Sequence, residues 1–378
     1  MVYLNTLITL IGVIFCIPSL AQPLTSTVLI PSPSPILNKP LMDWNFDIRY
    51  RFQARDDASV SNYISNSNSL RARLSLDMQP DDDFLVHVRF STGLGAASNI
   101  EQPLGKDGDL GTKSFGLDRA SIQWQPNAHW AVTAGKFKNA LHKPGASQLQ
   151  WDNDYNPEGF AISYRIKIGE QSELKWTAIN YLLDTTTDES TFPVLYGLQA
   201  TFSQDFKTFK YTLNAEGLQY LDLDSRPVYG NIGTNTQSGD AYVVDYNIVG
   251  GGIDITYFGL PLPLLVYGDY AHNSILRENS TAHEAGVKYG DLANNYEWQF
   301  FAAYKEVGKD AFLDLFSEGA FMGGGTDNRG TVFGIGYQTT DNTTLQFNYF
   351  KGERYIAQGD ASPTTDFEQL QTMFTVKY

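Results

Sequence analysis

Apolar and polar side chains alternate in short runs from Trp44 to the last residue of the chain. In WNFDIRYRFQ (44–53) every second residue is aromatic or aliphatic, and the residues between them are Asn, Asp, Arg or Gln. The segment LRARLSLDMQ (70–79) repeats this pattern. A period of two residues predicts β-strands with one apolar and one polar face. Ten residues are also about the length that a tilted transmembrane strand needs.

The same alternation recurs along the chain and predicts sixteen strands. They are expected near residues 44–53, 70–79, 84–90, 118–125, 130–138, 159–167, 173–182, 194–203, 207–217, 247–258, 263–272, 282–290, 296–305, 330–338, 343–350 and 368–378.

Short and long connections alternate between these strands. The short ones are 80–83, 126–129, 169–172, 205–206, 259–262, 291–295 and 339–342; the long ones are 54–69, 91–117, 139–158, 183–193, 218–246, 273–281, 306–329 and 351–367. This layout is typical of bacterial outer-membrane barrels. We therefore expect an all-β chain that folds as a transmembrane antiparallel up-and-down β-barrel of about 16 strands, with short periplasmic turns and long extracellular loops.

A soluble β-sandwich is the alternative fold, because its strands also alternate. Its connections, however, have no reason to alternate in length. The apolar faces here carry Trp or Tyr near strand ends, as Trp44, Trp130 and Trp298 do, which suits aromatic girdles at a membrane interface. Lipid cannot hydrate an unpaired strand edge, so a sheet in a membrane has to close into a barrel.

The N-terminus is interpreted as a targeting segment. Residues 6–20 contain no charge and lead to Ser19-Leu20-Ala21, which resembles a cleavage site, so residues 1–21 are expected to be a signal peptide. A membrane anchor is the alternative. Residues 22–42 are rich in Pro and Ser and are expected to form a tether, which leaves 43–378 for the barrel. Cys16 is the only cysteine, so the mature chain would have no disulfide framework or thiol catalyst.

The composition excludes some partners and is compatible with a barrel. The chain has 27 Lys and Arg against 42 Asp and Glu, a net charge of −15, so a nucleic-acid partner is not expected. Aromatic residues make up 13%, with 22 Tyr and 23 Phe, which favours strands over helices.

Several segments resemble the putative porin family of Gram-negative outer membranes. They are AGKFKNALHK (134–143), LQWDNDYNPEGFAISY (149–164), GGGTDNRG (323–330), the pair Arg71-x-Arg73-Leu74 and the terminal Tyr378. The resemblance implies an outer-membrane channel for passive diffusion and does not name a solute. A final strand that ends in an aromatic residue also resembles the signal that barrel assembly machinery reads, so Tyr378 is expected to bind that machinery.

Basic residues gather on the predicted lumen face of the first five strands. We call them the basic wall: Arg49, Arg51, Arg71, Arg73, Arg89, Arg119 and Lys136, with His87 and Lys138 as further candidates. They are interpreted as half of a charged constriction that favours anions. The alternative is an ordinary solvated wall that Asp47, Asp77 and Asp118 neutralise. Lys136 depends on its register, because Gly135 could introduce a bulge before it.

Two long loops contain further candidate residues. The 139–158 loop holds Asp152, Asp154 and Glu158 in a D-x-D-x-N run that superficially suits calcium. Pro157 and Ser163 occupy positions where an EF-hand needs Gly and Glu, so no metal is assigned, and the loop is expected to fold against the basic wall. The apolar segment AFLDLFSEGAF (311–321) should pack inward or against a neighbouring protomer.

Catalytic motifs give little support for an enzyme. The five histidines are scattered, and the chain has no nucleophile elbow, Walker loop or H-E-x-x-H motif. We therefore expect a porin that forms a water-filled diffusion channel for small hydrophilic solutes or ions, without a cofactor. It would lie in outer-membrane lipid, where it could form a homotrimer. A barrel with a plugged lumen that binds a surface partner is the second hypothesis, and an outer-membrane hydrolase is the third.

Overall fold

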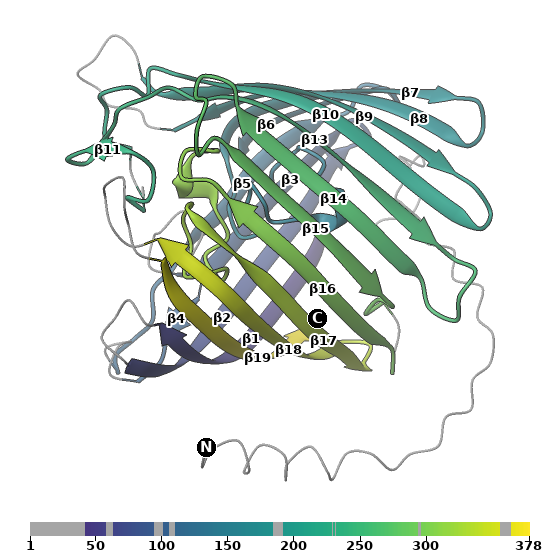
Figure 1. The fold of residues 1–378 in the computed structure, drawn as a ribbon. Helices are drawn as coiled ribbons and strands as arrows, with labels where there is room; N and C mark the ends of the chain where they lie inside the picture. Colours follow the sequence, from purple (N-terminus) through teal and green to yellow (C-terminus); the bar gives the residue numbers. More distant parts are fainter. Residues whose placement is uncertain are drawn as a thin grey trace. The chain divides into compact units, whose positions relative to one another are not determined.

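A closed antiparallel β-barrel accounts for nearly all of the described chain (Figure 1). The computed structural model describes residues 42–57, 63–93, 101–105, 110–183, 192–228, 230, 232–293, 296–355 and 364–378. The expected signal peptide and all of the expected tether except Met42 lie outside the described residues.

Sixteen long strands form the barrel. They are β1 (Met42–Asp57), β2 (Tyr63–Asp81), β3 (Phe84–Thr92), β5 (Phe115–Trp124), β6 (Trp130–Lys136), β7 (Glu158–Ile168), β8 (Ser172–Leu182), β9 (Val194–Asp205), β10 (Phe209–Leu221), β13 (Asn247–Tyr257), β14 (Leu264–Asn273), β15 (Thr281–Tyr289), β16 (Trp298–Val307), β17 (Asn328–Thr340), β18 (Thr343–Tyr355) and β19 (Thr364–Lys377). The all-β fold and the strand number predicted from the sequence are confirmed.

Four short elements complete the described structure. The two-residue strand β4 (Gln102–Pro103) pairs with β2, and β11 (Gln237–Ser238) pairs with β12 (Ala241–Tyr242) in a small hairpin. Two 3₁₀ turns, η2 (Pro144–Ala146) and η3 (Asp314–Phe316), lie in connections between strands. Among the described residues, no helix is long and apolar enough to cross a membrane.

The ends of the chain close the barrel. Strand β1 pairs with both β2 and β19. Its ladder with β19 runs from Asp47 opposite Lys377 to Asp57 opposite Phe367. Beyond the ladder, Phe46 and Tyr378 exchange two backbone hydrogen bonds of 2.8 and 2.7 Å. Such a closed ladder leaves the barrel without a free edge for lipid to face, which is what a membrane requires.

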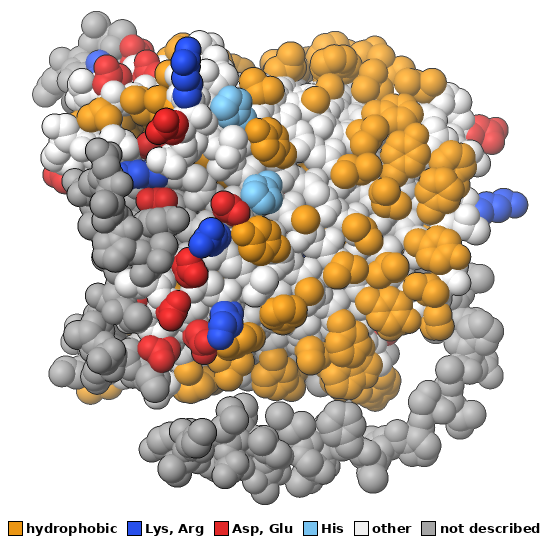
Figure 2. Space-filling view, viewed as in Figure 1, with side chains coloured by type: hydrophobic (Ala, Val, Ile, Leu, Met, Phe, Trp, Pro, Cys, Tyr) orange, Lys and Arg blue, Asp and Glu red, His pale blue; other side chains and the backbone are white. Residues whose placement is uncertain are grey.

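The alternation of side chains along each strand separates an outer from an inner face. In β10, Leu213 and Ala215 are exposed, whereas Thr212, Asn214 and Glu216 are buried. Exposed apolar side chains cover most of the face seen in Figure 2, and the charged ones gather toward the end with the long loops. This distribution fits a band of lipid contact around the outside of the barrel.

Several connections differ in length from the prediction, and two of them have a visible cause. The link between β1 and β2 is only residues 58–62 instead of 54–69, because both strands continue as paired backbone past their apolar stretch. The turn between β15 and β16 is longer, residues 290–297, because Tyr296 has φ of 64° and its N–H bonds the Gln338 carbonyl. Strict alternation of short and long connections therefore fails at β15, where the turn 290–297 is longer than the preceding connection 274–280, whereas the link 58–62 is still longer than the turn 82–83.

The hydrophobic core lies inside the barrel, at the end with the long loops. The connections 137–157, 222–246 and 308–327 fold inward and bury a shared set of large side chains. Phe316 packs against Trp151, with 4.6 Å between ring centroids, and against Tyr155 at 4.5 Å. The apolar 311–321 segment thus packs inward, and Phe312 and Phe316 are each only 1% exposed.

Candidate functional site in the barrel lumen

The predicted arginines of the basic wall come together on four strands. Arg49 of β1 lies directly opposite Arg71 of β2, and Arg89 of β3 lies opposite Arg119 of β5. Like charges placed opposite each other destabilise a sheet unless other groups compensate. This wall therefore needs acids nearby, and the structure supplies them.

Four arginines of the basic wall have a carboxylate partner. Asp47 binds both Arg71, at 3.0 Å, and Arg73, at 2.6 Å. Asp118 pairs with Arg89. Glu101 pairs with Arg49, whose Nε lies 2.7 Å from Oε1.

These acids reduce the positive charge of the wall without removing it. Asp47 and Asp118 were predicted as neutralising groups, and both do pair with arginines. Asp77, the third predicted acid, lies 2.6 Å from the ring of His87 instead of near an arginine.

The 137–157 loop lies against the basic wall, as the sequence predicted. Asp154 reaches Arg49 at 3.7 Å and Arg71 at 3.8 Å. Asn156, which is 3% exposed, accepts a 2.7 Å hydrogen bond from Arg119 and donates one of 2.7 Å to Asp118. The loop thus completes the hydrogen bonding of the arginines from inside the lumen.

Lys136 departs from the predicted wall, and this part of the prediction is wrong. It lies opposite Ala120 and Glu158, and its Nζ is 2.8 Å from Glu158 Oε1, a side chain that is 60% exposed. The pairing of β6 is regular through Gly135, so Lys136 shares the outward face of Trp130 and Val132. Lys138 instead lines a lumen pocket together with Arg119, where burial, followed by repulsion from Arg119 and Arg89, lowers its pKa.

The three predicted loop acids have different surroundings. Asp154 faces the basic wall, and Glu158 pairs with Lys136 at the start of β7. Asp152 is buried and accepts hydrogen bonds from Asp154 N, at 2.7 Å, and Gly319 N, at 3.0 Å. Burial, followed by repulsion from Asp154, raises the pKa of Asp152 to about 7. Within the described chain, no group of three or more acids, histidines or cysteines could hold a metal ion.

The loop is also fixed to the opposite wall of the barrel. The ring of His142 lies 2.8 Å from Asp254 on β13, and Gln150 donates a 2.7 Å hydrogen bond to Glu216 on β10. Lys305 of β16 binds the Gln148 carbonyl at 3.1 Å. Because loop residues contact strands on both sides, the loop crosses the lumen and narrows it.

Sequence reasoning missed this second anchoring wall. Glu216, Asp254 and Lys305 all occupy inward positions of alternating strands, the same signal that identified the arginines. Their place between outward-facing neighbours marks them as lumen residues in the sequence as clearly as it marks the arginines.

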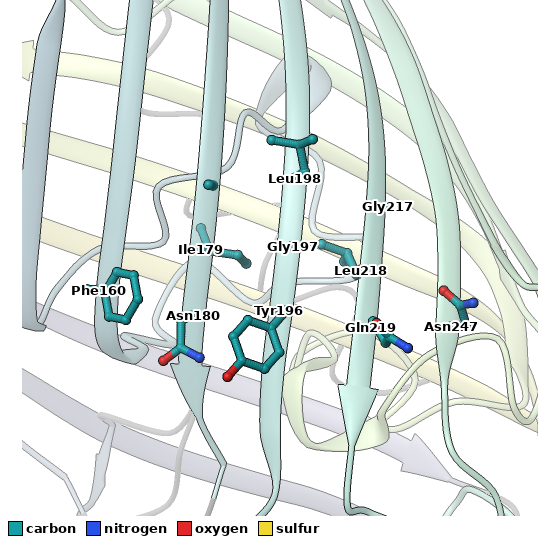
Figure 3. A pocket seen from close by; sticks show the side chains of 11 residues that line it. Phe160, Ile179, Asn180, Tyr196, Gly197, Leu198, Gly217, Leu218, Gln219 and Asn247 are labelled. Carbon is teal, nitrogen blue, oxygen red and sulfur yellow. The ribbon is translucent and has the colours of Figure 1, made fainter.

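Outside the lumen, the outer surface of β7 to β13 has a shallow depression (Figure 3). It encloses about 490 Å³ between the exposed side chains of Phe160, Tyr196 and Leu198, above the small residue Gly217. Buried Ile179 and Leu218 form its floor. Its place on the outer wall keeps it off any path through the barrel.

The model of one protein family matches nearly the whole barrel. That family is described as "Putative porin", and it matches residues 50–211 and 190–368. The chain belongs to the putative porin family. It is an outer-membrane porin, and the recognition made from its sequence motifs is confirmed.

Solved structures similar to this porin share its fold at low sequence identity. Pseudomonas putida OprB matches with a TM-score of 0.56 and 10% identity, over 89% of this chain and 94% of that one. The outer membrane channel DcaP of Acinetobacter baumannii gives 0.53 and 12%, over 89% and 97%. Salmonella typhi OmpF, solved in complex with daunomycin, gives 0.53 and 11%, over 89% and 97%. No protein with a curated description matches the chain.

Proposed function

We propose that this porin forms a water-filled channel, that its narrow section lies between the basic wall and the 137–157 loop, and that it favours small anions over cations. The barrel fold and the family membership support the channel itself. Its selectivity would follow from the charged groups that meet where the loop crosses the lumen.

An excess of positive charge at this crossing carries the proposal. Five carboxylates act on the wall here, those of Asp47, Glu101, Asp118, Asp152 and Asp154. Seven cations lie on the wall or face it, which leaves an excess of two positive charges on this side of the loop: Arg49, Arg51, Arg71, Arg73, Arg89, Arg119 and Lys138. Rings of charged side chains at a constriction are a common basis of ion selectivity.

The excess charge acts on solutes at short range. At physiological ionic strength the Debye length is about 8 Å, so charges at a pore mouth are screened more than those in a narrow passage. A hydrophilic anion passing the loop would meet arginines within that distance. The same arginines would repel a cation and so raise the energy barrier to its passage.

We also propose that the chain is a channel and not an enzyme, because its family and fold are those of porins and its lumen groups pair as arginine and carboxylate. Tyr378, which is 84% exposed, would remain accessible to assembly machinery. The outer apolar band would contact outer-membrane lipid and, in a homotrimer, the neighbouring protomers.

The test is the reversal potential of single channels under a KCl gradient, measured for Arg51→Gln combined with Arg73→Gln. Asp47 keeps Arg71 as its partner in this variant, so no carboxylate is left unpaired. We expect the wild type to favour chloride and the variant to move toward potassium selectivity. The charge-matched control is Lys167→Gln with Lys207→Gln, near the short turns, and it should leave the potential almost unchanged. Equal shifts in both double variants would contradict a constriction at the basic wall.

A further inference from the structure

A pocket of about 320 Å³ lies in the lumen beside the narrow section. The inner faces of β2, β3, β5, β6, β7 and β8 line one side of it, β2 through Asp77, and Phe137, Lys138 and Ala140 of the loop line the other. Leu85, Gln123 and Ala131 place it toward the short-turn end of these strands, beyond the loop for a solute that enters from outside. A volume of this size falls within the range of small-molecule sites.

Asp77 is the one carboxylate among the described residues that line this pocket, and it pairs with His87 instead of with a cation. Lys138 and Lys175 both line it, and within the described part of the chain neither forms an ion pair. Arg119 also lines it and donates from Nε to the neutral amide of Asn156, at 2.7 Å. Burying a cation without a counter-ion is costly, so such a group indicates that something else supplies the negative charge.

Several other side chains of the pocket can donate hydrogen bonds. Hydroxyl groups come from Ser121, Thr133 and Ser163. His87 lies with Nδ1 2.6 Å from Asp77, so the proton on Nδ1 is used in that contact, and Nε2 would donate to a ligand only from the protonated ring. Three cations and several hydroxyls form a set of donors that matches the oxygens of a carboxylate or a phosphate.

We propose that this pocket is a binding site for small organic anions, those with carboxylate or phosphate groups, on their way through the channel. The proposal rests on the proposed function, because it assumes that anions reach the pocket past the basic wall. Arg119 belongs to both places and would pass the anion from the wall to Lys138 and Lys175. Binding at this site would raise the occupancy of the channel by such solutes when they are dilute, whereas a pore without a binding site would depend on diffusion alone.

The test measures block of the KCl current through single channels by succinate, by inorganic phosphate and by erythritol, a neutral solute of similar size. We expect both anions to block at saturable concentrations and erythritol to give no saturable block. In Lys138→Gln with Lys175→Gln, the half-blocking concentration should rise by about tenfold or more, the effect of losing charge-assisted hydrogen bonds. The matched control, Lys167→Gln with Lys207→Gln, should block like the wild type, and Lys138→Arg with Lys175→Arg should retain most of the affinity.

Two results would overturn the site. One is an unchanged half-blocking concentration in the Lys138 and Lys175 double variant, and the other is equal, non-saturable behaviour of succinate, phosphate and erythritol in the wild type. The reversal potential in KCl, recorded on the same channels, reports the anion preference separately. A channel that prefers chloride but shows no saturable block would therefore contradict the binding site and leave the proposed anion preference intact.

Discussion

At the scale of single residues, several charged groups of the lumen are buried and paired with an opposite charge. Arg71 is 5% exposed and Arg89 is 6% exposed, yet each has an acid within ion-pair distance. Removing one member of a buried pair leaves the other charge uncompensated, at a cost of about 3–5 kcal/mol. Substitutions that probe selectivity should therefore avoid Arg89, since Asp118 has no second arginine in ion-pair contact among the described residues.

Asp152 predicts a pH dependence of the contact between two loops. Its carboxyl joins the 137–157 loop to Gly319, and its pKa in the folded protein is about 7 against an ordinary value of 3.8. The folded state therefore binds this proton more tightly than the unfolded state does. The resulting stability is fully present below about pH 4 and is lost as the pH rises through about 7.

We therefore expect the free energy of unfolding of the wild type to fall, relative to that of Asp152→Asn, as the pH rises from about 4 to about 7. Urea titrations of the refolded barrel at several pH values measure both proteins. The same pH dependence in both would show that another group controls the stability.

At the scale of elements, each barrel strand has an outer face that requires apolar side chains and an inner face that accepts polar ones. Phe333 in the middle of β17 is 52% exposed and lies opposite Ala302 and Tyr349 on the outer surface. Gln346 of the neighbouring strand β18 lies opposite Gly336 and Met373 on the inner face. Only the first side chain would contact lipid.

Phe333→Arg should therefore destabilise the folded barrel by about 2–4 kcal/mol, the cost of a charged side chain near the bilayer midplane. Gln346→Arg should cost much less, because its side chain faces the lumen. Refolding titrations in urea with lipid vesicles measure both values. Comparable losses would mean that the assigned faces of these strands are wrong.

Elements also show how far the sequence predicts the structure. Alternation identified all sixteen barrel strands and the inward arginines, because a strand with one face in lipid must have period two. It did not identify the strand ends, since residues 65–69, SNSNS, are polar although they continue β2. For Lys136 the alternation from Trp130 does give the observed outward face, so its inclusion in the basic wall goes against the pattern of its own strand.

Contacts between distant loops could not be predicted from these patterns. Trp151 and Phe316 pack together although they are far apart in the chain, and neither loop has a regular period. The apolar composition of 311–321 indicated burial but not its partner. Likewise, Lys175 of β8 lines the proposed anion pocket together with residues of β3 and β5, because the barrel curves. The alternation within one strand does not show which other strands face it across a curved wall.

At the scale of the whole molecule, the sign of the charge differs between the chain and the narrow section. The net charge is −15, whereas the groups at the basic wall carry an excess of positive charge. Acids elsewhere would attract cations to the pore mouths, where salt screens them. The narrow section should outweigh the mouths, because every permeating ion has to pass the wall at close range.

Single-channel conductance in a planar bilayer tests the central claim most directly, that water fills a continuous path past the 137–157 loop. The inward packing of 308–327 against that loop makes a sealed barrel the physical alternative, and a sealed barrel would suit a surface-binding protein. We expect discrete conductance steps that grow with KCl concentration, together with a reversal potential on the chloride side. A correctly refolded barrel that inserts into the bilayer but carries no ionic current would contradict this account.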